Sequence, residues 1–405
     1  VSEDTARAFY RAQKEKRPIV LNVPSDFVDV PVEFHPLVLP VFSGTALVSE
    51  GEDFDAALGM LASAKRPIIL VGAGAVEARD DLIALADRLE APLATTLKAK
   101  DLFREHPANM GLFGTLSTPL AYDAIAKADC IAAFGASLHY FTTEHGGLLR
   151  GKRVVQVSND PADLGKTFHP DAALVSDPAQ TARLFVQWLD EAEIEPSGFT
   201  DELDLENLAS HPLPKGRSAV EGALSFEVAL ERLNELLPKN RVLTTDGGRF
   251  MTEVWCRVAA DTPRHFLSGT DSGSIGMGLQ GAIGTALADP GRRVCHFTGD
   301  GGFMMGGLTE FNTAVRLNLP IVVIVCNDAA YGAEHIQLKD RGMDPKTTEF
   351  DWPSFAATAR ALGGEGLEIA SINDWGRAEE ALAHQTGPLL IELKLDPNDV
   401  PRMRI

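Results

Sequence analysis

Two oxygen-bearing side chains, Asp300 and Asn327, stand where two apolar runs of the sequence end. Residues 293–298 lead into Asp300 and its glycine neighbours Gly299, Gly301 and Gly302, and residues 321–326 lead into Asn327. We expect a strand, a turn, a helix and a second strand, with both side chains at the edge where open α/β sheets bind ligands. Carboxylate and carboxamide oxygens suit Mg²⁺, and the glycines let backbone N–H groups approach a diphosphate at a helix start. The pattern predicts a clamp for Mg²⁺ and a diphosphate.

The GDG triplet at 299–301, followed by an Asn 27 residues after Asp300, is similar to the cofactor-binding motif of thiamine-diphosphate (ThDP) dependent enzymes. This resemblance implies that Asp300, Asn327 and the backbone carbonyl of Ala329 hold the metal. Family members often carry two Asn where this chain has Asn327 and Asp328. An ordinary strand–helix–strand unit could contain the triplet alone, but the triplet, the helix, the second strand and the Asn together favour the ThDP interpretation.

A second glycine-dense segment, GTDSGSIGMGLQGAIG at 269–284, leads into a helix of small residues. Alone, it fits close packing of a helix on a sheet equally well. In decarboxylases and acetolactate synthases, which it resembles, this segment carries the apolar wedge that bends ThDP into a V, here Ile275. The resemblance also implies aminopyrimidine contacts from the backbone of Gly273 and Ile275. The turn TTDGGRF at 244–250 resembles the other diphosphate turn of the family, which implies contacts from Gly248 and Arg249.

Composition is typical of an enzyme of several domains rather than a nucleic-acid or membrane protein. The chain has 405 residues, 45% of them hydrophobic, which predicts two or three domains. A formal charge of −20 argues against nucleic-acid binding. No apolar run reaches the roughly 18 residues of a membrane span, and no secretory pattern is found. The four cysteines form no CxxC pair, so we expect buried, reduced thiols in a cytoplasmic protein.

Strand and helix patterns divide the chain into three α/β parts. Residues 53–190 alternate apolar runs with helical patterns, which predicts a doubly wound, mainly parallel, Rossmann-like sheet. A second such domain, with the diphosphate site, is expected at 218–405, and linkers at 34–52 and 191–217. Residues 1–33 contain a helical stretch and the apolar run RPIVLNVP, which resembles the last strand of the family's pyrimidine-binding domain. We therefore expect most of that domain, with its activating Glu, to lie upstream of Val1.

The middle domain and one histidine leave alternatives open. VGAGA at 71–75 follows an apolar run but lacks a full GxGxxG fingerprint. FAD-using acetolactate synthases usually carry an Arg-containing stretch where this chain has LHYFTTEHGG (138–147), so a middle domain without FAD or nucleotide is favoured over one with FAD. His335, just beyond the proposed metal turn, either contacts the substrate or is an ordinary surface histidine.

The resemblance implies a ThDP- and Mg²⁺-dependent lyase or transferase that cleaves or joins carbon–carbon bonds of a small 2-oxo acid. It resembles acetolactate synthase or a 2-oxo acid decarboxylase, and family membership implies a homodimer or homotetramer. The alternatives are a ThDP-dependent oxidase, an acyl-CoA lyase, or a non-catalytic nucleotide-binding or regulatory homologue that uses VGAGA. The retention of Asp300, Asn327 and Ile275 argues against the last of these.

Overall fold

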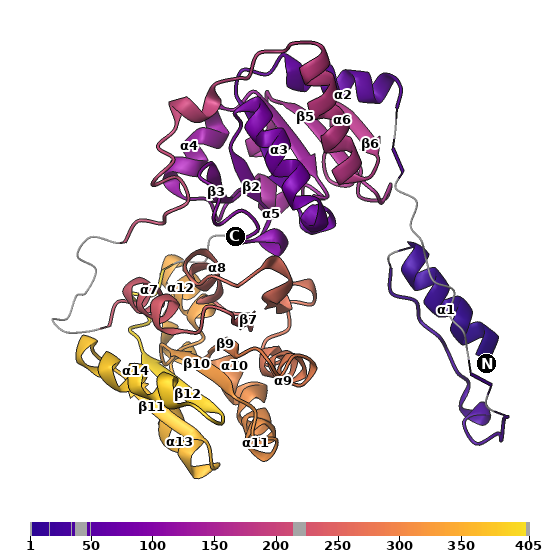
Figure 1. The fold of residues 1–405 in the computed structure, drawn as a ribbon. Helices are drawn as coiled ribbons and strands as arrows, with labels where there is room; N and C mark the ends of the chain where they lie inside the picture. The colour runs from indigo at the N-terminus through magenta and orange to yellow at the C-terminus, as the bar shows by residue number, and fades with distance from the viewer. Residues whose placement is uncertain are drawn as a thin grey trace. The chain divides into compact units, whose positions relative to one another are not determined.

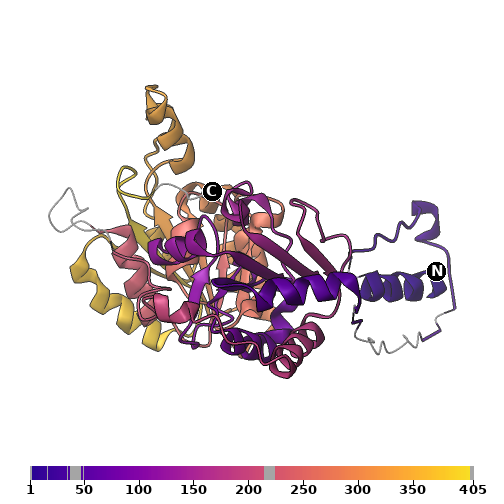
Figure 2. The same cartoon turned by 90° about the horizontal axis from the view of Figure 1, so that it is seen from above.

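The computed structural model describes residues 2–15, 17–33, 35–36, 47–48, 50–213 and 224–401. The chain forms two units, Val1–Leu47 and Val48–Ile405. In the first unit, α1 (Ser2–Glu15) confirms the expected helix, and both views draw it as one straight helix (Figures 1 and 2). The strand expected at 17–24 is wrong: residues 18–24 form no strand, and Val20 is 90% exposed. An extended apolar run becomes a strand only when neighbouring strands pair with it, and no described residue of this unit does so.

The first sheet of the larger unit has six parallel strands, which confirms the expected doubly wound fold. Its order is β3-β2-β1-β4-β5-β6, from β1 (Pro67–Val71), β2 (Leu93–Thr95), β3 (Asn109–Leu112), β4 (Cys130–Phe134), β5 (Arg153–Ser158) and β6 (Ala172–Val175). One face packs on α2 (Glu52–Ala62), α3 (Arg79–Leu89) and α6 (Pro178–Glu191), and the other on α4 (Pro119–Lys127) (Figure 1). Strands buried on both faces explain the continuous apolar runs of the sequence.

Local capping sets where two of these helices begin. Thr118 and Asp177 each accept a hydrogen bond from a first-turn amide, and a proline opens each helix. The stretch expected as a linker after residue 191 is in part packed on the first sheet: Phe199 is fully buried, and Thr118 Oγ1 donates to the carbonyl of Leu208 at 2.6 Å. Residues 214–217 of that stretch, and most of the linker expected at 34–52, lie outside the described residues.

The second sheet also has six parallel strands, in the order β11-β12-β10-β9-β7-β8. They are β7 (Val242–Thr245), β8 (Phe266–Ser268), β9 (Val294–Gly299), β10 (Ile321–Asn327), β11 (Glu365–Ile369) and β12 (Leu389–Lys394). One face packs on α7 (Phe226–Leu236), α8 (Met251–Arg257) and α14 (Trp375–His384), and the other on α9 (Gly278–Ala288), α11 (Leu308–Arg316) and α13 (Phe355–Ala361). After β7 the chain adds β8 on one side and then returns to add β9 on the other side. Open parallel sheets bind ligands at such a switch point, here between β7 and β9.

Two further expectations concern the whole chain. All four cysteines are unpaired, and Cys130, Cys295 and Cys326 are buried as expected. Cys256 is only partly buried, so the expectation is wrong for that residue. Within the ranges that the structure describes, no helix combines the length and the apolar character needed to cross a membrane.

Candidate functional site

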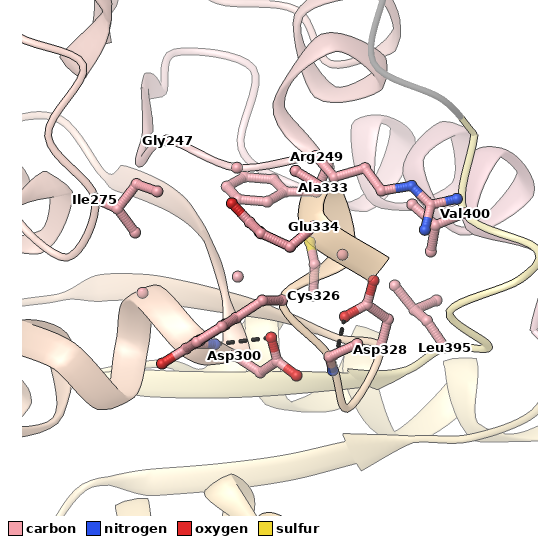
Figure 3. A pocket seen from close by; sticks show the side chains of 18 of the residues that line it. Gly247, Arg249, Ile275, Asp300, Cys326, Asp328, Ala333, Glu334, Leu395 and Val400 are labelled. Atoms are coloured by element: carbon pink, nitrogen blue, oxygen red, sulfur yellow. Dashed lines mark hydrogen bonds between the residues drawn. The ribbon is translucent and has the colours of Figure 1, made fainter. Parts of the chain in front are cut away.

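A cavity of about 290 Å³ opens where β7, β9 and β10 end. The register of β9 and β10 pairs Gly299 with Cys326, so the turns after these strands lie side by side, as the sequence predicted. Figure 3 shows Asp300 and Asp328 on one side of the cavity and Ile275 at another. The lining also includes residues of the turn after β7 and of the segment after β10: Gly247, Gly248, Arg249, Phe250, Ala330, Tyr331, Gly332, Ala333 and Glu334.

Asp300 is held in a fixed orientation at the start of the helical segment after β9. Its side chain is 3% exposed, Oδ1 accepts from the N–H of Gly301 at 2.7 Å, and Oδ2 accepts from Trp352 Nε1 at 3.0 Å. Burial raises the pKa of this carboxyl to about 6. A buried carboxylate that accepts hydrogen bonds from neutral donors is suited to a cation.

Asn327 and Ala329 occupy the neighbouring strand end, next to Asp300. The Asn327 side chain donates to Glu392 Oε1 at 2.8 Å and accepts from the N–H of Ala329 at 3.0 Å. Ala329 takes a left-handed conformation (φ 56°), and its carbonyl accepts from the N–H of Phe350 at 2.9 Å. Each of these two oxygens therefore keeps a second lone pair for a further partner.

Asp328 is a site residue that the sequence reasoning treated only as a variation of the motif. It lines the cavity and is 7% exposed, and burial together with the charge of Asp300 raises its pKa to about 7. Arg249 opposes this rise, but its guanidinium also donates to the carbonyls of Pro397 (2.6 Å) and Pro401 (3.0 Å). Two buried carboxyl groups with so little compensating charge fit a divalent cation.

Several positions of the site require glycine because neighbouring atoms lie too close for a Cβ. A Cβ on Gly301 would lie 2.5 Å from the ring of Tyr331, and one on Gly332 would lie 2.7 Å from Asp328 Oδ2. A Cβ on Gly302 would lie 2.6 Å from a carboxylate oxygen of Asp246. Gly248 has a φ of 152°, which side-chain-bearing residues rarely adopt. Backbone therefore forms much of the cavity wall, as a diphosphate cradle needs.

Asp246 is the second residue that the sequence reasoning missed. It directly follows β7 and is 2% exposed, and its Oδ2 accepts from the N–H of Gly276 at 2.8 Å and from Thr298 Oγ1 at 3.3 Å. It thus fixes the loop that carries Ile275, which is 49% exposed. Gly273 lies in the same loop with a φ of 63° but does not line the cavity. The signal available in the sequence was only the Asp between Thr245 and the glycine pair.

His335 does not line the cavity, although its neighbours Ala333 and Glu334 do. It is 2% exposed on α12 (Gly332–Asp340), so the surface-histidine alternative is wrong. Its Nδ1 lies 3.5 Å from Thr348 Oγ1 and 3.8 Å from Glu349 Oε1. These contacts pack α12 on the segment that follows it, and they give no support to the expected substrate contact.

The VGAGA turn of the first sheet is filled by protein backbone. The N–H of Gly72 donates to the carbonyl of Phe134 at 2.9 Å, and the N–H of Gly74 donates to that of Gly135 at 3.0 Å. A Cβ on Gly72 would lie 2.3 Å from the Gly135 carbonyl oxygen. A nucleotide phosphate would need these amides, but they already donate to backbone carbonyls. The glycines allow the loop after β1 to pass close to the loop after β4.

The site fits Mg²⁺ and a diphosphate. It offers oxygen atoms of Asp300, Asn327 and Ala329, two buried carboxyl groups whose charge is only partly compensated, and a cradle of glycines. The cavity lining also includes the apolar Ile275, Met305, Leu395 and Val400. Figure 3 shows Ile275 on a different side of the cavity from Leu395 and Val400. The shape of the site therefore suits a ligand with an anionic group near Asp300 and Asn327 and an apolar or aromatic body beyond it.

Comparisons with known proteins agree with this geometry. The family model described as "Thiamine pyrophosphate enzyme, central domain" matches residues 54–185, and "Thiamine pyrophosphate enzyme, C-terminal TPP binding domain" matches residues 246–393. Sulfoacetaldehyde acetyltransferase of Alcaligenes xylosoxydans xylosoxydans is 30% identical over 414 residues, which cover 93% of this chain and 68% of that protein. The Castellaniella defragrans protein of the same name is 28% identical over 409 residues (93% and 67%). Acetolactate synthase isozyme 1 large subunit of Escherichia coli (strain K12) is 26% identical over 396 residues (94% and 68%).

Proposed function

Because the chain belongs to the family of thiamine-diphosphate-dependent enzymes, we propose that it cleaves or joins a carbon–carbon bond of a small 2-oxo acid with ThDP and Mg²⁺. The observation that carries the proposal is the juxtaposition of Asp300, Asn327 and Ala329 beside a glycine cradle at one sheet edge. The finer assignment, to an acetolactate synthase-like reaction, rests on relatives of that name at 26% identity.

Asp300, Asn327 and the carbonyl of Ala329 would hold Mg²⁺, and the backbone of Gly248, Arg249, Gly299, Gly301 and Gly302 would surround the diphosphate. The side chain of Arg249 is directed towards Val400 and donates to backbone carbonyls, so the proposal assigns it no diphosphate contact (Figure 3). When bound, ThDP supplies the nucleophilic carbon and the electron sink that carbon–carbon cleavage needs.

At the other end, Ile275 would support the bend of the cofactor, while the backbone of Gly273 and Ile275 would face its aminopyrimidine ring. Asp246 holds this loop through Gly276. Three apolar side chains at this end are exposed: Ile275 (49%), Met277 (62%) and Met305 (57%). Such a patch beside a site favours a covering partner, which supports the proposal of a homo-oligomer.

The test is ligand binding followed by product analysis on the full-length protein. The thermal unfolding temperature with ThDP plus Mg²⁺ should lie well above the temperature measured with either ligand alone. ADP and FAD should leave the unfolding temperature unchanged. Turnover is then assayed with pyruvate, other 2-oxo acids and sulfoacetaldehyde, the last because of the names of two relatives. A response to FAD or ADP without one to ThDP would contradict the proposal.

A further inference from the structure

Each of the three groups proposed to hold the metal is itself hydrogen-bonded to a residue from a later part of the chain. Trp352 Nε1 donates to Asp300 Oδ2 at 3.0 Å, and the N–H of Phe350 donates to the carbonyl of Ala329 at 2.9 Å. Asn327 Nδ2 donates to Glu392 Oε1 at 2.8 Å. Partners of this kind orient metal ligands, and their loss commonly weakens metal binding.

Resting on the proposed function, we propose that Trp352 is a positioning residue for the metal ligand Asp300. The Gly301 N–H donates to Oδ1 of the carboxylate and the Trp352 indole donates to Oδ2, so donors on opposite oxygens orient the group. The backbone N–H groups of Ala329 and Ala330 also lower the pKa of this carboxyl, and the indole adds a side-chain donor to these backbone donors. The indole N–H is neutral, and it cannot replace a cation as a counter-charge. The indole N–H therefore orients the carboxylate of Asp300 and leaves the negative charge of that carboxylate available to a metal ion.

The indole of Trp352 is itself held by aromatic packing. Its ring stacks on Phe350, with centroids 4.5 Å apart and planes 17° apart, and the Phe355 ring lies 6.5 Å away. Phe350 in turn contacts Tyr331, whose ring packs over Gly301. The short segment 350–352 therefore donates hydrogen bonds to two of the proposed metal-binding residues. Its backbone amide at Phe350 bonds Ala329, and its indole at Trp352 bonds Asp300.

A purely packing role for Trp352 makes a different prediction from a positioning role. Trp352→Phe keeps an aromatic ring against Phe350 but removes the N–H group. If only packing matters, Mg²⁺ affinity should stay unchanged in this variant. If the N–H orients Asp300, Mg²⁺ affinity should fall while the fold of the free protein is retained.

The experiment compares full-length wild type, Trp352→Phe and a matched control, Trp188→Phe, in which an exposed tryptophan of α6 is replaced. Calorimetric Mg²⁺ titration at saturating ThDP should give about 10- to 100-fold weaker binding for Trp352→Phe and unchanged binding for the control. Thermal unfolding without ligands should differ little among the three proteins.

Tryptophan emission supplies a readout that does not depend on activity. Addition of Mg²⁺ and ThDP should change the emission of wild type and of Trp188→Phe, and Trp352→Phe should lose most of that change. Unchanged Mg²⁺ affinity in Trp352→Phe, or no emission change in saturated wild type, would overturn the positioning role and leave the proposed function intact. Failure of wild type to bind ThDP with Mg²⁺ would instead overturn the proposed function and this inference with it.

Discussion

At the scale of single residues, the site depends on charge that the protein does not fully compensate. Asp300 and Asp328 are both buried, and the pKa of each carboxyl is raised by burial, to about 6 and about 7. Arg249 is the cation that lowers the pKa of Asp328, and it shares its donors with two backbone carbonyls. A bound divalent cation would supply the missing charge.

Replacing Asp300 by Ala should abolish ThDP binding at millimolar Mg²⁺ because it removes the carboxylate of the proposed metal ligands. Loss of an outer partner alone costs up to about 100-fold in metal affinity, so loss of a ligand should cost more. The fold should persist, since the variant removes a poorly solvated carboxyl group. Calorimetry of ThDP with Mg²⁺ measures the effect, with Asp80→Ala, whose side chain is 89% exposed, as the control. ThDP affinity equal to wild type would disprove the metal assignment.

The raised pKa values predict how pH acts on the ligand-free protein. Both groups have a higher pKa folded than unfolded, so the folded state binds more protons between about pH 4 and pH 7, and stability falls as pH rises through that range. Asp328→Asn should remove part of this loss and stabilise the protein at pH 8 by on the order of 2 kcal/mol. With Mg²⁺ and ThDP present, the gain in stability of Asp328→Asn over wild type should be smaller. Unfolding curves at pH 4 and pH 8 test this, and an equal effect of the variant at both would contradict it.

Ile275→Ala should separate cofactor binding from turnover. The diphosphate end of the proposed site would stay intact, whereas the support for the bent cofactor would be lost. Because orientation of reacting groups can lower a barrier by several kcal/mol, turnover should fall much further than ThDP affinity. Steady-state kinetics and calorimetry on the same preparation make the comparison. Parallel loss of both, or unchanged turnover, would show that Ile275 is not the wedge.

At the scale of elements, the site is made by turns that approach one another closely. The helical segment after β9 begins as α10 (Asp300–Gly302), widens into a π-helical turn at Phe303–Gly307 and continues as α11. π-Helical turns of this kind often occur at functional sites. Here the turn brings Gly306 against Gly276, the residue that follows Ile275.

Gly306→Ala tests this contact because a Cβ there would lie 2.1 Å from the Gly276 carbonyl oxygen. We expect a loss of about 1–3 kcal/mol in unfolding free energy and weaker ThDP binding, since the Ile275 loop must move. Gly281→Ala on α9 is the matched control, because nothing lies within 4 Å of its added Cβ. That control should stabilise the protein by about 0.5–1 kcal/mol. Similar behaviour of the two variants would refute the close contact.

At the scale of the whole molecule, the sequence predicted what depends on local pattern and missed what depends on distant contacts. Buried strands and the strand-end positions of Asp300 and Asn327 follow from apolar runs and their ends, and the structure has them. Trp352 reaches the site from the loop before α13, and Glu392 reaches it from β12. Their contacts depend on the folded arrangement, so no spacing in the sequence indicates them. The apolar run at 17–24 failed as a strand because pairing partners, not propensity, decide strand formation.

The two sheets of the larger unit are joined by a buried charged contact. Lys100, which follows β2, contacts Asp101 and donates to the carbonyl of Val258 at 3.0 Å, and Asp101 accepts from the N–H of Ala260 at 2.9 Å. The Lys100 side chain is 4% exposed and that of Asp101 is 17% exposed. An ammonium group in this position depends on its carboxylate partner, because burying an unpaired charge is costly.

Asp101→Asn should therefore destabilise the larger unit by up to about 3 kcal/mol, since it leaves the buried ammonium of Lys100 without its anion. Asn also tolerates the left-handed backbone of this position (φ 67°), so the effect reports on charge rather than on strain. Calorimetric unfolding should begin to separate into two transitions as the sheets lose this link. The control is Glu202→Gln, which breaks a pair with Arg66 in which both side chains are 43% exposed, and it should cost less than about 1 kcal/mol. If both variants unfold as wild type does, in one transition at the same temperature, the Lys100–Asp101 contact does not couple the two sheets.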